Sequence, residues 1–183
     1  MLSKLFGRQK SVQEQPRGGS GELPFSVVLL LRKYVPLSNG DLQAAAERGW
    51  ERSFDGKEDP AFCVMGKRGQ QFVKAGSHVL ALLEGSKGYL GKQKEVAKQL
   101  RSEHQARVWR QHRGWLALDL WNLELPKAEA YSVLARLAIP LLATPRMSKS
   151  CVGVYLPRES VFAPNDGAAE EGLNLMLHHQ FTV

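Results

Sequence analysis

The side chains most often used in catalysis are scattered along this chain. None of its five histidines and two cysteines stands at the spacing of a zinc site, and no G-x-S-x-G nucleophile elbow occurs. Gly85, Gly88 and Gly91 do not match the spacing of a dinucleotide- or phosphate-binding loop. We therefore expect no complete catalytic set, no metal ion and no cofactor.

One predicted strand, WLALDLW, groups side chains that suit the binding of a partner. In an extended conformation its Trp115, Asp119 and Trp121 share one face. An acid between two tryptophans fits either a ligand cleft or an exposed edge, and the sequence does not separate the two. Trp109 and His112, which close the preceding helix, complete this candidate binding surface.

The most prominent charge feature lies just before this strand. Between residues 84 and 113, eight Lys and Arg stand against three Glu, so this stretch holds five of the seven net positive charges of the chain. Its periodicity predicts a helix over 91–112, with Lys94, Lys98 and Arg101 on the face opposite the apolar side. Such a face either follows a phosphate backbone or is a solvated cationic surface. The two glutamates within it favour the second interpretation.

Length and composition define the broad class of protein. The chain has 183 residues, of which 43% are hydrophobic and 23% are charged. These values are typical of one globular domain and exclude a collagen-like, coiled-coil or wholly disordered protein. The net charge of +7 favours contact with nucleic acid or an anionic surface without establishing either. Cys63 and Cys151 lie in apolar runs, so we expect buried, reduced thiols.

The ends of the chain differ from its centre. Residues 1–24 are rich in Gly, Ser, Gln and Pro and predict a disordered tail, followed by one domain over 25–176 and a short tail over 177–183. The N-terminus lacks the apolar run of a secretory signal, and no run approaches the roughly 20 residues that a membrane span needs. We therefore expect a cytoplasmic protein.

Hydrophobic periodicity predicts an α+β fold. The order is β, α, β, β, α, β and then α, β, which matches the ferredoxin-like βαββαβ order with an αβ extension. We expect a single mixed or antiparallel sheet with helices largely on one face. Strands are predicted over 25–34, 61–67, 78–84, 115–121 and 151–156, with a short extended piece over 71–74. Helices are predicted over 39–51, 91–112, 126–142 and 166–176.

Two finer expectations concern the core and one proline. Pro140 should kink or end the helix over 126–142, because proline has no amide hydrogen to donate. Eight side chains on the apolar faces are expected in the core: Leu29, Leu31, Leu80, Leu82, Leu116, Leu118, Leu134 and Val154.

Three segments are similar to a bacterial domain-of-unknown-function family. They are LLLRKYVPLS from Leu29, WRQHRGWLAL from Trp109 and the strand around Gly153, and the similar region covers about residues 25–173. The resemblance implies a cytosolic bacterial α+β domain without an assigned activity. It supplies no catalytic residues for this chain.

These observations favour a protein that acts by binding, with another protein as its partner, rather than by catalysis. One alternative is a nucleic-acid-binding module that uses the cationic helix over 91–112. Another is an enzyme whose site is assembled from His78, His112 and Asp119.

Overall fold

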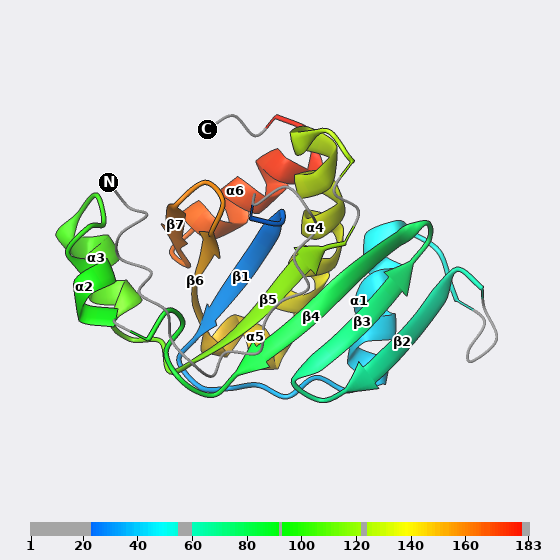
Figure 1. Ribbon diagram of the computed structural model, residues 1–183, viewed down its shortest axis with the longest axis horizontal. Coiled ribbons are helices and arrows are strands. Elements are labelled where there is room, and N and C mark those ends of the chain that lie inside the picture. Colours follow the sequence, from blue (N-terminus) through cyan, green and yellow to red (C-terminus); the bar gives the residue numbers. More distant parts are fainter. Residues whose placement is uncertain (1–22, 55–59, 92, 122–123, 181–183) are drawn as a thin grey trace.

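The computed structural model describes residues 23–54, 60–91, 93–121 and 124–180, and the statements below concern these residues. The predictions for residues 1–22 and 181–183 lie outside them. The described residues form one antiparallel sheet of seven strands in the order β2-β3-β4-β5-β1-β6-β7 (Figure 1). The strands are β1 (Ser26–Leu31), β2 (Phe62–Lys67), β3 (Gln70–Ala75), β4 (His78–Gly85), β5 (Gly114–Leu120), β6 (Cys151–Leu156) and β7 (Val161–Pro164). The helices are α1 (Asn39–Trp50), α2 (Gln93–Ala97), α3 (Glu103–Trp109), α4 (Lys127–Leu142), α5 (Pro145–Ser150) and α6 (Ala168–Leu177).

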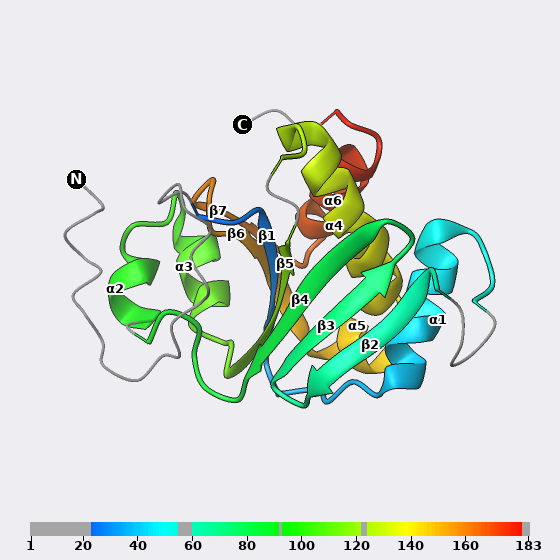
Figure 2. The same ribbon diagram turned by 45° about the vertical axis from the view of Figure 1, so that its right-hand side comes forward.

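Helices lie on both sides of the sheet. Figure 2 shows α2 and α3 on one side, and α1, α4 and α5 on the other. We call the side of α1 and α4 the first face and the side of α2 and α3 the second face. The first face carries the larger core, and all eight predicted core side chains are buried there.

The central strand β1 is covered on both of these faces. Val27, Leu29 and Leu31 belong to the larger core, whereas Val28 and Leu30 belong to the smaller one. All six positions of β1 are therefore buried, which explains its unbroken apolar run.

The α+β class with one antiparallel sheet is confirmed, but the ferredoxin-like order is not. The segment predicted as a short extended piece is β3, a full strand of six residues. As a result β2, β3 and β4 form consecutive antiparallel hairpins, with no helix between them. The ferredoxin-like order has two consecutive strands between its helices, whereas three follow one another here.

The predicted helix over 91–112 is two short helices. It breaks after α2, and a new helix begins at Ser102, whose side chain accepts a hydrogen bond from the amide of Gln105. An N-cap of this kind marks the start of a separate helix. The apolar periodicity continues through the break, because both helices pack on the same second face.

Pro140 does not end α4, since the helix continues to Leu142. Proline has no amide hydrogen for the carbonyl of Arg136, one turn earlier, and only the last turn follows it. The missing hydrogen bond therefore affects the end of the helix alone. Gly49 of α1 packs directly against this carbonyl.

Candidate functional site

His112, predicted as a binding residue, is completely buried at the end of α3. Its Nε2 accepts a hydrogen bond from the amide of Tyr89 at 2.9 Å, and its Nδ1 donates to the carbonyl of Trp109 at 2.5 Å. Burial lowers the pKa of this imidazole below its usual value of 6.5. The neutral His112 side chain therefore links the loop after β4 to the end of α3. Because it is buried, a binding partner cannot contact it.

Trp109 is also fully buried. Its ring packs edge-on against Tyr155 and Phe162, each at 5.2 Å between ring centroids. These aromatic side chains belong to the small core between α3 and the sheet. Trp109 thus holds α3 in place and lies away from the surface.

The other three predicted residues do share the second face. Trp115 is half-buried against Tyr89, with 5.2 Å between the ring centroids. Asp119 is 9% exposed, and burial raises the pKa of its carboxyl group, while a hydrogen bond with the Ser26 side chain opposes that shift. Trp121, which follows β5, is 49% exposed. The structure therefore brings one accessible tryptophan to this surface.

The residues of the enzyme hypothesis are not brought together. His78 lies on the first face, where burial lowers the pKa of its imidazole below the usual value, whereas Asp119 lies on the second face. Both ring nitrogens of His112 already have hydrogen-bond partners. In the part of the chain that the structure describes, no group of three His, Cys, Asp or Glu is arranged to hold a metal ion.

Cations from distant parts of the sequence gather where β1 ends. The amides of Arg32 and Lys33 donate to the backbone carbonyl and the hydroxyl of Ser150, at 2.7 and 3.1 Å. The guanidinium of Arg32 donates to Gln111 after α3, at 3.1 Å. These contacts place Arg32 and Lys33 between the end of α5, which carries Lys149, and the end of α3.

Arg113 joins the same end of the molecule. Its amide donates to the carbonyl of Leu31 at 2.8 Å. Its guanidinium donates to the carbonyls of Arg110 and His112, at 2.7 and 2.9 Å. The backbone therefore fixes this guanidinium in place, and the charge of Arg113 stays at the surface.

A tyrosine links the turn between β2 and β3 to this region. Arg68 donates to the hydroxyl of Tyr34 at 3.1 Å, and its guanidinium lies 5.4 Å from the centre of that ring. The Tyr34 hydroxyl in turn donates to one oxygen of Glu84, whose other oxygen is buried. Burial is the main cause that raises the pKa of Tyr34. The carboxylate of Glu84 is thus held by Tyr34, while the Arg68 side chain stays exposed.

Side-chain contacts with β7 and the following turn position α3 and its cations. Gln105 donates to the carbonyl of Phe162 at 2.9 Å, and the His104 ring lies 2.6 Å from the carboxylate of Asp166. A surface groove of about 520 Å³ lies between α2 and α3. Lys98, Arg107 and Arg110 line it, together with Ser102, Glu103 and the apolar Ala97, Leu100 and Ala106.

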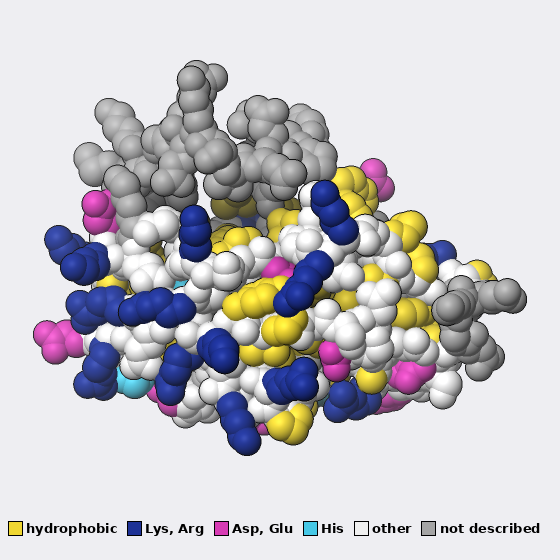
Figure 3. Space-filling view, turned by 90° about the horizontal axis from the view of Figure 1, so that it is seen from below, with side chains coloured by type: hydrophobic (Ala, Val, Ile, Leu, Met, Phe, Trp, Pro, Cys, Tyr) yellow, Lys and Arg dark blue, Asp and Glu magenta, His cyan; other side chains and the backbone are white. Residues whose placement is uncertain are grey.

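We call this region the basic end. Its exposed members are Arg32, Lys33, Arg68, Lys87, Lys94, Lys98, Arg101, Arg107, Arg110, Arg113 and Lys149. Figure 3 looks onto it from below, and Lys and Arg side chains spread over its left and centre with few Asp or Glu between them. Among the described residues, none of these eleven cations forms an ion pair with a carboxylate.

Seven of the eleven cations of the basic end lie in the positively charged stretch over 84–113. Lys94, Lys98 and Arg101 lie within the stretch whose charge is conspicuous. The other four, Arg32, Lys33, Arg68 and Lys149, were missed, because their three segments carry no conspicuous charge and only the folded sheet brings them here.

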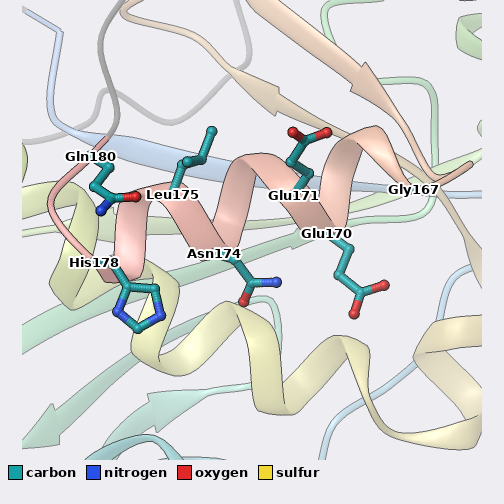
Figure 4. Close-up of a pocket in the computed structure, with 7 residues that line it drawn as sticks. All are labelled: Gly167, Glu170, Glu171, Asn174, Leu175, His178 and Gln180. Carbon is teal, nitrogen blue, oxygen red and sulfur yellow. The ribbon is translucent and has the colours of Figure 1, made fainter.

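A second groove, of about 460 Å³, runs along α6. Its lining comes from α6 and the residues at its two ends (Figure 4). Glu171 and Leu175 point to one side of the helix, whereas Glu170, Asn174 and His178 point to the other. These side chains do not converge on one point, so the groove offers no enclosed site.

No protein-family model matches this chain, and searches of curated proteins and of solved structures likewise find no match. The resemblance to a bacterial family therefore stays a prediction. In the described part of the chain, no helix is both long and apolar enough to span a membrane.

Proposed function

We propose that this protein binds nucleic acid through the basic end. The observation that carries the proposal is the convergence of exposed cations from several separate elements without carboxylate partners. Basic side chains clustered on one face are the electrostatic footprint of a nucleic-acid-binding protein. Each contact with a phosphate releases condensed counterions, which supplies affinity without sequence specificity.

The form of the surface favours nucleic acid over an acidic protein. The cations extend from the turn between β2 and β3, past the end of β1, to the groove between α2 and α3. A phosphate backbone carries regularly repeated charge over such a distance, whereas an acidic patch on a folded protein is local. A protein partner, which the sequence favoured, is therefore the alternative that the experiment must separate.

The test is the salt dependence of binding to a labelled duplex, measured by fluorescence anisotropy. Affinity should fall linearly on logarithmic axes, with a slope of about 0.9 for each phosphate contacted. The combined variant Lys94→Gln, Lys98→Gln and Arg101→Gln should flatten this slope by up to about 2.7, because it removes three cations.

The matched control is Arg48→Gln, Arg52→Gln and Arg136→Gln, which lowers the net charge by the same amount. Arg48 and Arg52 lie at the end of α1, and Arg136 lies in α4, on the first face of the sheet. This control should leave the slope unchanged. Equal flattening in both variants would mean that net charge alone attracts the duplex, and would refute the proposal. Tight binding of polyglutamate in place of nucleic acid would support the protein partner.

A further inference from the structure

In the described part of the chain, helices cover only part of the second face of the sheet. Helix α3 packs over β6 and β7, and α2 packs against α3. Among the described residues, no helix lies over this face at β2, β3 and β4 (Figures 1 and 2). We call this uncovered part the open face.

The strand register shows which side chains the open face presents. Met65 of β2 stands opposite Phe72 of β3, and Phe72 stands opposite Ala81 of β4. Met65 is 55% exposed, although it is a large apolar side chain on a strand. The ring of Trp121 meets Phe72 edge-on, with 5.4 Å between the centroids. The centre of the open face is therefore apolar and aromatic.

Its charged residues are almost all cations. Lys67 follows Met65 by two residues in β2, and Lys74 follows Phe72 by two residues in β3. Each lysine therefore lies on the same side of its strand as that apolar side chain. The acidic residue in this row of paired residues is Asp119 of β5, which stands opposite Ala81 and is buried. Arg68, in the turn between β2 and β3, belongs to the basic end and joins the two surfaces. An occupant of the open face should therefore combine flat apolar groups with negative charge.

We propose that the open face binds single-stranded nucleic acid, whose bases stack on Trp121 and Phe72. The phosphates of the same strand lie against Lys67 and Lys74 and continue onto the basic end. This inference rests on the proposed function. Bases in a duplex are already stacked and paired, so only a single strand can present its bases to these rings.

Base stacking and contacts with phosphates differ in how salt affects the affinity they supply. Trp121→Ala should lower the affinity for a labelled single strand of about 16 nucleotides by about 5- to 150-fold, the range expected for one lost base stack. The slope of affinity against salt should not change, because no cation is lost. Affinity for the duplex of the same sequence should also stay unchanged.

Two further variants test the kind of contact. Trp121→Phe keeps an aromatic ring and should recover most of the affinity. Leu175→Ala is the matched control, because Leu175 is an exposed apolar side chain on α6, away from the open face. Anisotropy with both DNA and RNA strands, and the melting temperature of each variant, complete the experiment. Equal affinities for Trp121→Ala and Leu175→Ala would overturn the inference.

The outcomes separate this inference from the proposed function. If the variant at Lys94, Lys98 and Arg101 weakens binding but Trp121→Ala does not, only the open-face inference fails. If neither single strand nor duplex binds, both fail. A dimer that forms with rising concentration and is lost in Trp121→Ala would assign the open face to a second copy of this chain, and would also overturn the inference.

Discussion

Replacing Gly49 by alanine should destabilise this protein, although the same change usually stabilises a helix. Gly49 lies in α1 and packs against the backbone of α4 at Arg136. An alanine Cβ at this position would lie 1.8 Å from the carbonyl oxygen of Arg136. That oxygen is the one for which Pro140 has no amide hydrogen. The close approach of the two helices thus depends on a residue without a side chain.

The structure sets the size of the effect. A Cβ almost never comes within 3.0 Å of a backbone atom, so α1 and α4 would have to separate by roughly 1 Å. Overpacking of this kind costs about 1–3 kcal/mol. The better helix propensity of alanine offsets up to about 1 kcal/mol of this cost. We expect a net loss of about 1–2 kcal/mol and a fall in Tm of roughly 2–8 °C.

Gly172→Ala is the matched control for this prediction. Gly172 lies in α6, and an added Cβ would meet no atom within 4 Å. This variant should gain about 0.5–1 kcal/mol and melt at a higher temperature. Both variants can be followed by circular dichroism during heating and during urea unfolding. The reasoning would be refuted if Gly49→Ala were as stable as Gly172→Ala.

Two further predictions concern titratable groups. Because burial lowers the pKa of His112, the unfolded chain binds a proton that the folded chain does not, and stability should fall as the pH drops below 6.5. Urea unfolding at about pH 7.5 and about pH 5.5 should show a smaller loss for His112→Gln than for the native protein, and an equal loss would contradict this account. Burial raises the pKa of the Cys151 thiol to about 12, so iodoacetamide should label Cys151 only after unfolding, whereas the half-buried Cys63 should react in the native protein. Mass spectrometry of the labelled peptides decides this, and early labelling of Cys151 would refute it.

Local patterns predicted the parts of the fold that depend on local chemistry. The unbroken apolar run over residues 25–34 predicted a strand there, and β1 lies within it with all of its positions buried. The helix predicted over 39–51 begins where expected, because Ser38 and Asp41 form both hydrogen bonds of a capping box at the start of α1. Such features require only neighbouring residues, so a single sequence is enough to find them.

The order of the strands could not be predicted in the same way. It depends on the pairing of β1 with β5 and with β6, which lie far along the chain. The break between α2 and α3 was missed because apolar side chains continue through it at helical spacing. Ser102 is the local clue, since serine is a preferred N-cap residue.

Depth of burial separates the predicted site residues that reach the surface from those that do not. Periodicity placed Trp109 and His112 beside apolar positions, but it could not show that a second core closes over them. Lys94, Lys98 and Arg101 are exposed, because lysine and arginine keep their charge in water unless they are paired. Charge patterns therefore predicted surface residues better than aromatic patterns did.

The composition of β3 connects the fold to the proposed binding surface. Unlike β1, this strand alternates, with Gln71, Val73 and Ala75 buried toward α1 and Phe72 and Lys74 on the opposite side. A strand face that only meets water usually carries polar side chains. Phe72 departs from this rule, and so do its neighbours Met65 and Trp121. Apolar side chains that gather at exposed positions of a sheet are typical of a binding surface, and the lysines between them fit the negatively charged strand that we propose as its occupant.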